Sequence, residues 1–147
     1  MTKKINIFFS LLVLSFFVFS KVSSAEIDNL FISLKNANDV SIAKIYEQKI
    51  WDHWLSSGSN ENNNILMKKG VTLMNVGKLD KALKVFIDLS KNDPDWAEPI
   101  NKISTIRYLQ GDFYGSIRDI QSTLKIEPRH FGAIAGLAQI NLALGRY

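Results

Sequence analysis

The sequence predicts an all-α protein built from stacked helical hairpins, and three observations lead to this prediction. A 34-residue pattern recurs through the second half of the chain. Within each unit, apolar residues follow helical spacing, and glycine and proline recur where helices would end. The chain has no cysteine, so no disulfide framework or thiolate metal site organises the fold. A single helical hairpin cannot bury both of its faces, so the units must stack.

Seven sets of residues keep the 34-residue offset, which is too many for coincidence. The glycine set is Gly77, Gly111 and Gly145, and the proline set is Pro94 and Pro128. The other five sets are small or apolar: Gly70/Ser104/Ala138, Ala82/Ser116, Leu66/Ile100/Ile134, Phe86/Ile120 and Leu79/Phe113/Tyr147.

The repeated glycines and prolines mark expected helix ends. Gly77 and Gly111 suit the left-handed backbone position that ends the first helix of each pair. Pro94 and Pro128 stop the second helix and begin the next connection.

The small and apolar positions predict how the two helices of a pair pack. Gly70 and Ala82 should face each other where the helices cross closely, because a larger side chain would push the backbones apart. Leu79, Leu83 and Phe86 lie at helical spacing and should form the apolar face of the second helix.

This register resembles the tetratricopeptide repeat (TPR) family over about 85 of the 147 residues. The unit of that family is an antiparallel helix pair with small residues at its eighth and twentieth positions, glycine near the fifteenth and proline near the thirty-second. The resemblance places repeat one at 63–96, repeat two at 97–130 and the first helix of an incomplete third repeat at 131–147. Lys69 and Arg107 depart from the leucine and aromatic residue that the family usually has there.

The first 25 residues have the three-part layout of a secretory signal. A positive start at 1–4 precedes an uncharged apolar run at 5–20, and Ser23 and Ala25 supply small residues before an expected cut after Ala25. The alternative is an uncleaved anchor, but the run has 16 residues before Lys21, whereas a spanning helix needs about 20. The expected location is the periplasm or outside the cell, with no membrane span after cleavage.

Residues 26–62 should form an N-terminal helical cap over the apolar end of repeat one. One helix is expected at about 28–36. A second should begin near Asn38 or Asp39, either of which can cap it, and continue to about 57. A polar break is expected at 56–64.

The helix expected at 131–144 is apolar on nearly every side, because no charged residue lies between His130 and Arg146. A terminal helix of a solenoid should be polar outside. Either the sequence is part of a longer protein that continues the third repeat, or this face docks a partner or a second copy.

The basic character of the chain comes from its beginning. Residues 1–25 carry three of the four net positive charges, and the remainder has 15 basic and 14 acidic side chains. That near-neutral remainder offers no broad cationic face to a nucleic acid.

No catalytic constellation, cofactor motif or metal motif is recognisable. His53 is expected to be a partly exposed helix residue, and His130, in the connection between repeats, is expected to be structural or solvent-facing. Trp96 should pack between neighbouring helices. Four acidic residues cluster near the end of repeat one but lack the EF-hand spacing that binds calcium: Asp88, Asp93, Asp95 and Glu98. They are attributed to helix ends and turns, and Asp95 is expected to cap the following helix.

The TPR resemblance implies a concave groove lined by the first helices of successive repeats. The implied groove residues are Asn64, Met67, Val71, Met74, Glu98, Asn101, Thr105, Tyr108, Ala135 and Gln139. Asn101 can pair with the backbone of an extended peptide. Some TPR adaptors grip a carboxyl terminus with lysine and asparagine where this chain has Met67 and Val71, so that ligand is not expected. The alternative is that these are ordinary solvated or half-packed helix positions.

These observations predict a non-catalytic protein-protein interaction module of the bacterial cell envelope that binds a peptide segment or partner protein in the groove. The alternative is a structural subunit that self-associates through helix 131–144. A third hypothesis is an enzyme whose active part lies beyond this sequence.

Overall fold

The computed structural model describes residues 25–146, and every regular element within that range is a helix. The chain divides between His53 and Trp54 into two compact units. The predicted secretory signal lies outside the described residues except for Ala25. No helix in the described part of the chain is both long and apolar enough to cross a lipid bilayer.

The first unit contains a helix at 25–35 and most of α2 (Val40–Leu55). Asp39 caps α2, because its Oδ1 accepts the backbone N–H groups of Ser41 at 2.6 Å and Ile42 at 3.3 Å. These hydrogen bonds hold the pKa of Asp39 below its usual value. Of the two expected caps, Asp39 is therefore the one used. The role of residues 26–62 as a cap over repeat one stays a prediction.

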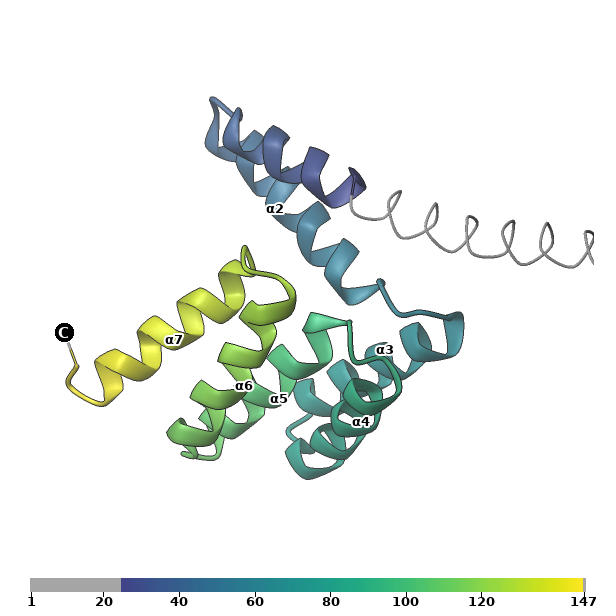
Figure 1. Cartoon of the computed structure of the whole chain (residues 1–147), viewed down its shortest axis with the longest axis vertical. Coiled ribbons are helices and arrows are strands. Elements are labelled where there is room, and N and C mark those ends of the chain that lie inside the picture. Colours follow the sequence, from purple (N-terminus) through teal and green to yellow (C-terminus); the bar gives the residue numbers. More distant parts are fainter. Residues whose placement is uncertain (1–24, 147) are drawn as a thin grey trace, which may run out of the picture. The chain divides into compact units, whose positions relative to one another are not determined.

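The second unit continues with five helices: α3 (Glu61–Asn75), α4 (Leu79–Asn92), α5 (Ala97–Leu109), α6 (Phe113–Ile126) and α7 (Phe131–Ala143). Each helix packs against the next along the chain, and α5 also contacts α7 (Figure 1). The predicted all-α solenoid of helical hairpins is confirmed. One boundary differs, because Asn60 Oδ1 accepts the N–H of Asn63 at 3.0 Å and starts α3 at Glu61, inside the expected polar break.

The turns follow the sequence prediction closely. Gly77, Gly111 and Gly145 have φ angles of 74°, 82° and 69°, and they follow α3, α5 and α7. This left-handed conformation is costly for any residue with a Cβ, so the glycines end the first helix of each pair. Pro94 and Pro128 lie in the turns after α4 and α6.

A cluster of buried side chains, here named the central core, joins α3, α4 and α5 around the fully buried ring of Phe86. Gly70 and Ala82 are both buried, but the three atoms nearest to a Cβ at Gly70 all belong to Phe86 and none to Ala82, the neighbour that the sequence predicted. A Cβ at Gly70 would lie 2.5 Å from Phe86 Cε1, so the aromatic ring itself requires glycine there. The central core consists of Met67, Ala82, Phe86, Leu89, Trp96, Ile103 and Ile106.

Candidate functional site

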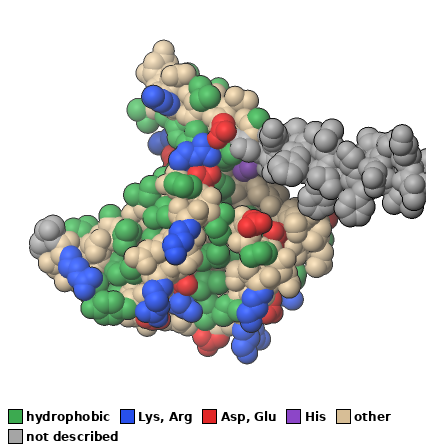
Figure 2. Space-filling view, viewed as in Figure 1, with side chains coloured by type: hydrophobic (Ala, Val, Ile, Leu, Met, Phe, Trp, Pro, Cys, Tyr) green, Lys and Arg blue, Asp and Glu red, His purple; other side chains and the backbone are tan. Residues whose placement is uncertain are grey.

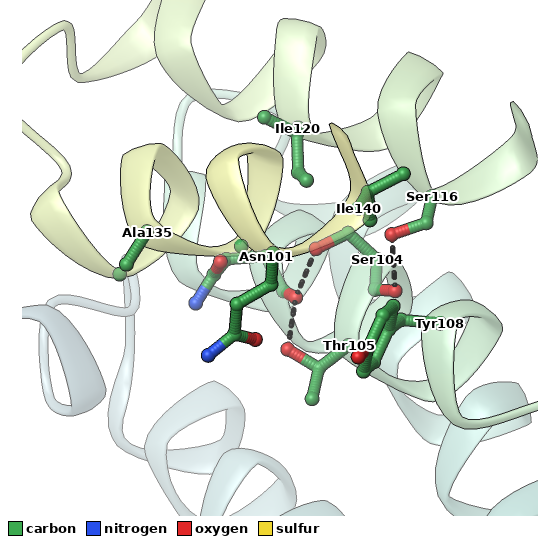
Figure 3. Close-up of a pocket in the computed structure, with 11 residues that line it drawn as sticks. Asn101, Ser104, Thr105, Tyr108, Ser116, Ile120, Ala135 and Ile140 are labelled. Atoms are coloured by element: carbon green, nitrogen blue, oxygen red, sulfur yellow. Dashed lines mark hydrogen bonds between the residues drawn. The ribbon is translucent and has the colours of Figure 1, made fainter. Parts of the chain in front are cut away.

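A pocket of about 130 Å³ opens between α5, α6 and α7 (Figure 3). Helices α5 and α7 are the first helices of successive pairs, and α6 connects them. The lining side chains are small, apolar or uncharged polar: Asn101, Ser104, Thr105, Tyr108, Ser116, Ile120, Gly132, Ala135, Gly136, Gln139 and Ile140.

Five of the expected groove residues meet in this pocket: Asn101, Thr105, Tyr108, Ala135 and Gln139. The remaining expected residues lie elsewhere. Asn64 is half-buried, and its Oδ1 accepts the N–H of Gly58 at 2.9 Å. Val71 and Met74 pack against the central core.

The prediction for Met67 is wrong. This side chain is fully buried in the central core with Phe86 and Trp96, so it cannot contact a ligand in an open groove. The helical register places it on the expected face of α3, but burial against α4 and α5 decides its role.

The serine and threonine hydroxyl groups of the pocket already donate hydrogen bonds to backbone carbonyl oxygens. Ser104 Oγ and Thr105 Oγ1 donate to the carbonyl oxygen of Asn101 at 2.7 and 3.0 Å, and Ser116 Oγ donates to that of Ser104 at 2.8 Å (Figure 3). A hydroxyl has one proton to donate. The side-chain donors left for a ligand are therefore the Tyr108 hydroxyl, the Gln139 amide and the second N–H of the Asn101 amide.

Glu98 is fully buried, which corrects its expected place in the groove. Its Oε2 lies 2.8 Å from His130 Nε2 and accepts from Asn101 Nδ2 at 3.1 Å. Its Oε1 lies 2.8 Å from Lys102 Nζ. Burial alone would raise the pKa of Glu98, but the hydrogen bond from His130 and the charge of Lys102 lower it below the usual value. The carboxylate is therefore ionised in the interior.

Two residues besides Glu98 contact the His130 ring. Its Nδ1 accepts the N–H of Ala133 at 3.2 Å and so caps α7. Its ring stacks on Trp54, with ring centroids 4.0 Å apart and planes 9° apart. Of the two roles expected for His130, the structural one is confirmed, since the side chain is fully buried.

The comparisons with known proteins agree with this architecture. The chain matches no family model. It is 34% identical over 115 residues to a TPR repeat-containing protein of Rhizobium etli, an alignment that covers 78% of this chain and 56% of that protein. The chain is a TPR protein. It spans about half the length of this curated relative.

A solved structure shows the same fold. The structure of a MamA mutant, a TPR-type protein, superposes with a TM-score of 0.52 at 16% sequence identity, covering 84% of this chain and 86% of that one. TPR repeat proteins are generally non-catalytic scaffolds, and their fold is that of a protein-interaction module.

The TPR register explains why Trp96 and His130 are buried. They occupy equivalent positions 34 residues apart, before α5 and α7. Trp96 packs in the central core, as predicted, and its Nε1 donates to the Trp54 carbonyl oxygen at 2.6 Å. The register could have revealed the burial of His130, but it carries no sign of the pairing with Glu98.

Asp95 also differs from the prediction, in addition to Glu98. The N-cap residue of α5 is Trp96, without a side-chain cap, so the expected capping role of Asp95 is wrong. Asp93 instead accepts the N–H of Ser59 at 2.6 Å and the side-chain amide of Asn63 at 3.1 Å. In residues 25–146, no group of three potential ligand side chains could hold a metal ion.

Proposed function

We propose that this TPR protein is a non-catalytic module of the bacterial cell envelope that holds an extended segment of a partner protein in the pocket between α5 and α7. The observation that carries the proposal is the convergence of Asn101, Thr105, Tyr108 and Gln139 on one pocket. The signal-like residues 1–25 support a location in the periplasm or outside the cell.

The chemistry of the pocket suits a peptide. Asn101, Tyr108 and Gln139 supply the uncharged donors and acceptors that a peptide backbone needs. Ile120 and Ile140 supply apolar surface. The volume of about 130 Å³ is close to that of a cavity of about 150 Å³ that accepts benzene, so one medium-sized side chain fits.

The test captures a partner with the immobilised full chain from periplasmic and cytosolic fractions, identifies it by mass spectrometry and measures its affinity by calorimetry. The partner should come from the periplasmic fraction. Tyr108→Phe and Gln139→Ala each remove a hydrogen-bonding group, so each should weaken the Kd about fivefold, equivalent to about 1 kcal/mol.

The controls place the same changes outside the pocket. Tyr114→Phe and Gln121→Ala alter exposed residues of α6 and should leave the Kd unchanged. If Tyr108→Phe and Gln139→Ala bind the partner as tightly as the unaltered chain does, the pocket is not the binding site.

A second candidate function rests on the outer face of α7. Ile134 is 50% exposed and Leu142 60% exposed, and with Ala138 they lie four residues apart along one side of the helix. Hydrophobic side chains gather over the α7 region on the left of the space-filling view (Figure 2). With no charged residue at 131–145 to repel a like surface, two copies could associate through this face.

This alternative predicts a molar mass that rises with protein concentration in light scattering. Ile134→Glu or Leu142→Glu should abolish the rise, because a charge would be buried without a partner. Val76→Glu changes a residue that is 62% exposed after α3 and should not affect the mass. A constant monomer mass would exclude self-association. Leu137 is unsuitable for this test because it packs against Ile120, Ala133 and Ile140.

A further inference from the structure

We infer that the buried pair Glu98–His130 fixes Asn101 as a hydrogen-bond acceptor toward the pocket, so that the pocket selects a backbone N–H and rejects a free carboxylate. The inference rests on the proposed function, because it takes the pocket to be a peptide site. It assigns Glu98 and His130 as positioning residues and Asn101 as the residue that determines ligand polarity.

The contacts of His130 fix the tautomer of its ring. Its Nδ1 accepts the N–H of Ala133 at 3.2 Å, so the proton of the neutral ring lies on Nε2. That Nε2–H points at Glu98 Oε2, 2.8 Å away. Glu98 therefore receives a hydrogen bond from an imidazole that the cap of α7 and the stacked Trp54 ring hold in one orientation.

Glu98 in turn sets the orientation of the Asn101 amide. Glu98 is held ionised and can only accept hydrogen bonds, so the Asn101 atom 3.1 Å from Glu98 Oε2 must be the amide nitrogen. Turning the amide over would bring two oxygens together. The Asn101 Oδ1 is therefore left on the other side of the amide.

The Asn101 Oδ1 has no hydrogen-bond donor in the described part of the chain. Asn101 is only 5% exposed and lines the pocket, and Figure 3 shows its amide oxygen on the side of Thr105 and its nitrogen on the side away from it. Within residues 25–146, no group donates a hydrogen bond to Asn101 Oδ1. This oxygen is not among the enclosed side-chain atoms that lack a hydrogen-bond partner, so a ligand in the pocket can reach it and donate to it.

The pocket lining disfavours a negatively charged ligand. No lining residue is charged, so the pocket offers no cation to a carboxylate. A carboxylate at this position would meet the Asn101 oxygen, acceptor against acceptor. An amide N–H pairs with that oxygen, and Tyr108 and Gln139 can donate to the neighbouring peptide carbonyl. The chemistry thus fits the interior of a polypeptide rather than its carboxyl end.

The test uses a pool of five-residue peptides of uncharged residues, each present in equal amounts as an acetylated amide and as an acetylated free acid. The full chain is immobilised, and the retained peptides are quantified by mass spectrometry. The unaltered chain should retain the amide forms about tenfold over the acids, which corresponds to about 1.4 kcal/mol.

Glu98→Gln should bring this ratio close to one, because a glutamine can donate as well as accept and lets the Asn101 amide turn over. Asn101→Ala should have the same effect on the ratio while leaving the Glu98–His130 pair in place, which covers the case that Glu98→Gln does not fold. Asp88→Asn makes the same carboxylate-to-amide change at an exposed position of α4 and should keep the tenfold ratio.

The outcomes separate the two proposals. If the acids are retained as well as the amides, or if the preference persists in both Glu98→Gln and Asn101→Ala, this inference is overturned and the peptide-binding function stands. If neither form of any peptide is retained by the unaltered chain, the proposed function fails and the inference fails with it.

Discussion

Replacing Phe86 with alanine should lower the free energy of unfolding by about 3–5 kcal/mol, the cost of deleting a buried aromatic side chain and leaving a cavity. Phe86 is fully buried at the junction of three helices. Net stabilities of domains are about 5–15 kcal/mol, so this variant should lose a large share of its stability and unfold at a lower urea concentration. Urea denaturation followed by circular dichroism measures the change.

A matched control and a double variant sharpen this result. Leu109→Ala truncates a side chain that is 55% exposed and should change stability by about 0.5 kcal/mol or less. Gly70→Ala should destabilise the unaltered chain, because the new Cβ would meet the Phe86 ring. In the Phe86→Ala background the ring is gone, and Gly70→Ala should stabilise by about 1 kcal/mol through its helix propensity. Additive effects of the two substitutions would contradict the proposed contact.

Replacing His130 with alanine should lower the free energy of unfolding by about 3–5 kcal/mol, because one partner of a buried pair is removed. The variant also loses the cap of α7 and the stacking on Trp54. His53→Ala changes the other histidine, which is half-exposed, and should cost about 1 kcal/mol or less. Equal losses in both variants would show that the Glu98–His130 pair has no special stabilising role.

The same pair predicts how stability depends on pH. The folded-state pKa of Glu98 lies below its usual value of 4.5, so its carboxylate stabilises the fold above about that pH and loses this contribution as the pH falls through the folded-state pKa. The stability difference between the unaltered chain and Glu98→Gln should therefore be largest near neutral pH and shrink in acid. Burial raises the pKa of Asp119 despite Arg107, but that effect is common to both proteins and cancels. A difference that stays constant with pH would contradict the assignment.

The repeat architecture was predictable because its signals are local. A glycine at the left-handed end of a helix, such as Gly77 or Gly111, and a proline in the turn after one, such as Pro94, act through the backbone of their own neighbourhood. These signals recur at a fixed interval, so the order of the helices and the existence of a stacked core followed from the sequence. The start of α3 was predicted less precisely. Asn60 caps this helix from within the polar run that was expected to be a break, so α3 begins at Glu61.

The candidate site was predictable only in part. The TPR resemblance named the residues of α5 and α7 that meet in the pocket, among them Asn101, Tyr108 and Gln139. It also named Met67 and Glu98, which are fully buried. A repeat register gives the face of a helix on which a residue lies. Whether that face is open or covered depends on neighbours that the register does not specify.

By itself, the sequence determined the helical hairpins, their turns and the 34-residue offset that relates them, because backbone preference and helical spacing act over a few residues. Only the tertiary structure decided that Phe86 fills the space over Gly70 and that Glu98 meets His130, 32 residues along the chain. Those two contacts depend on the shapes of helices packed together and on the exclusion of water from a carboxylate, and neither is a property of a short stretch of sequence.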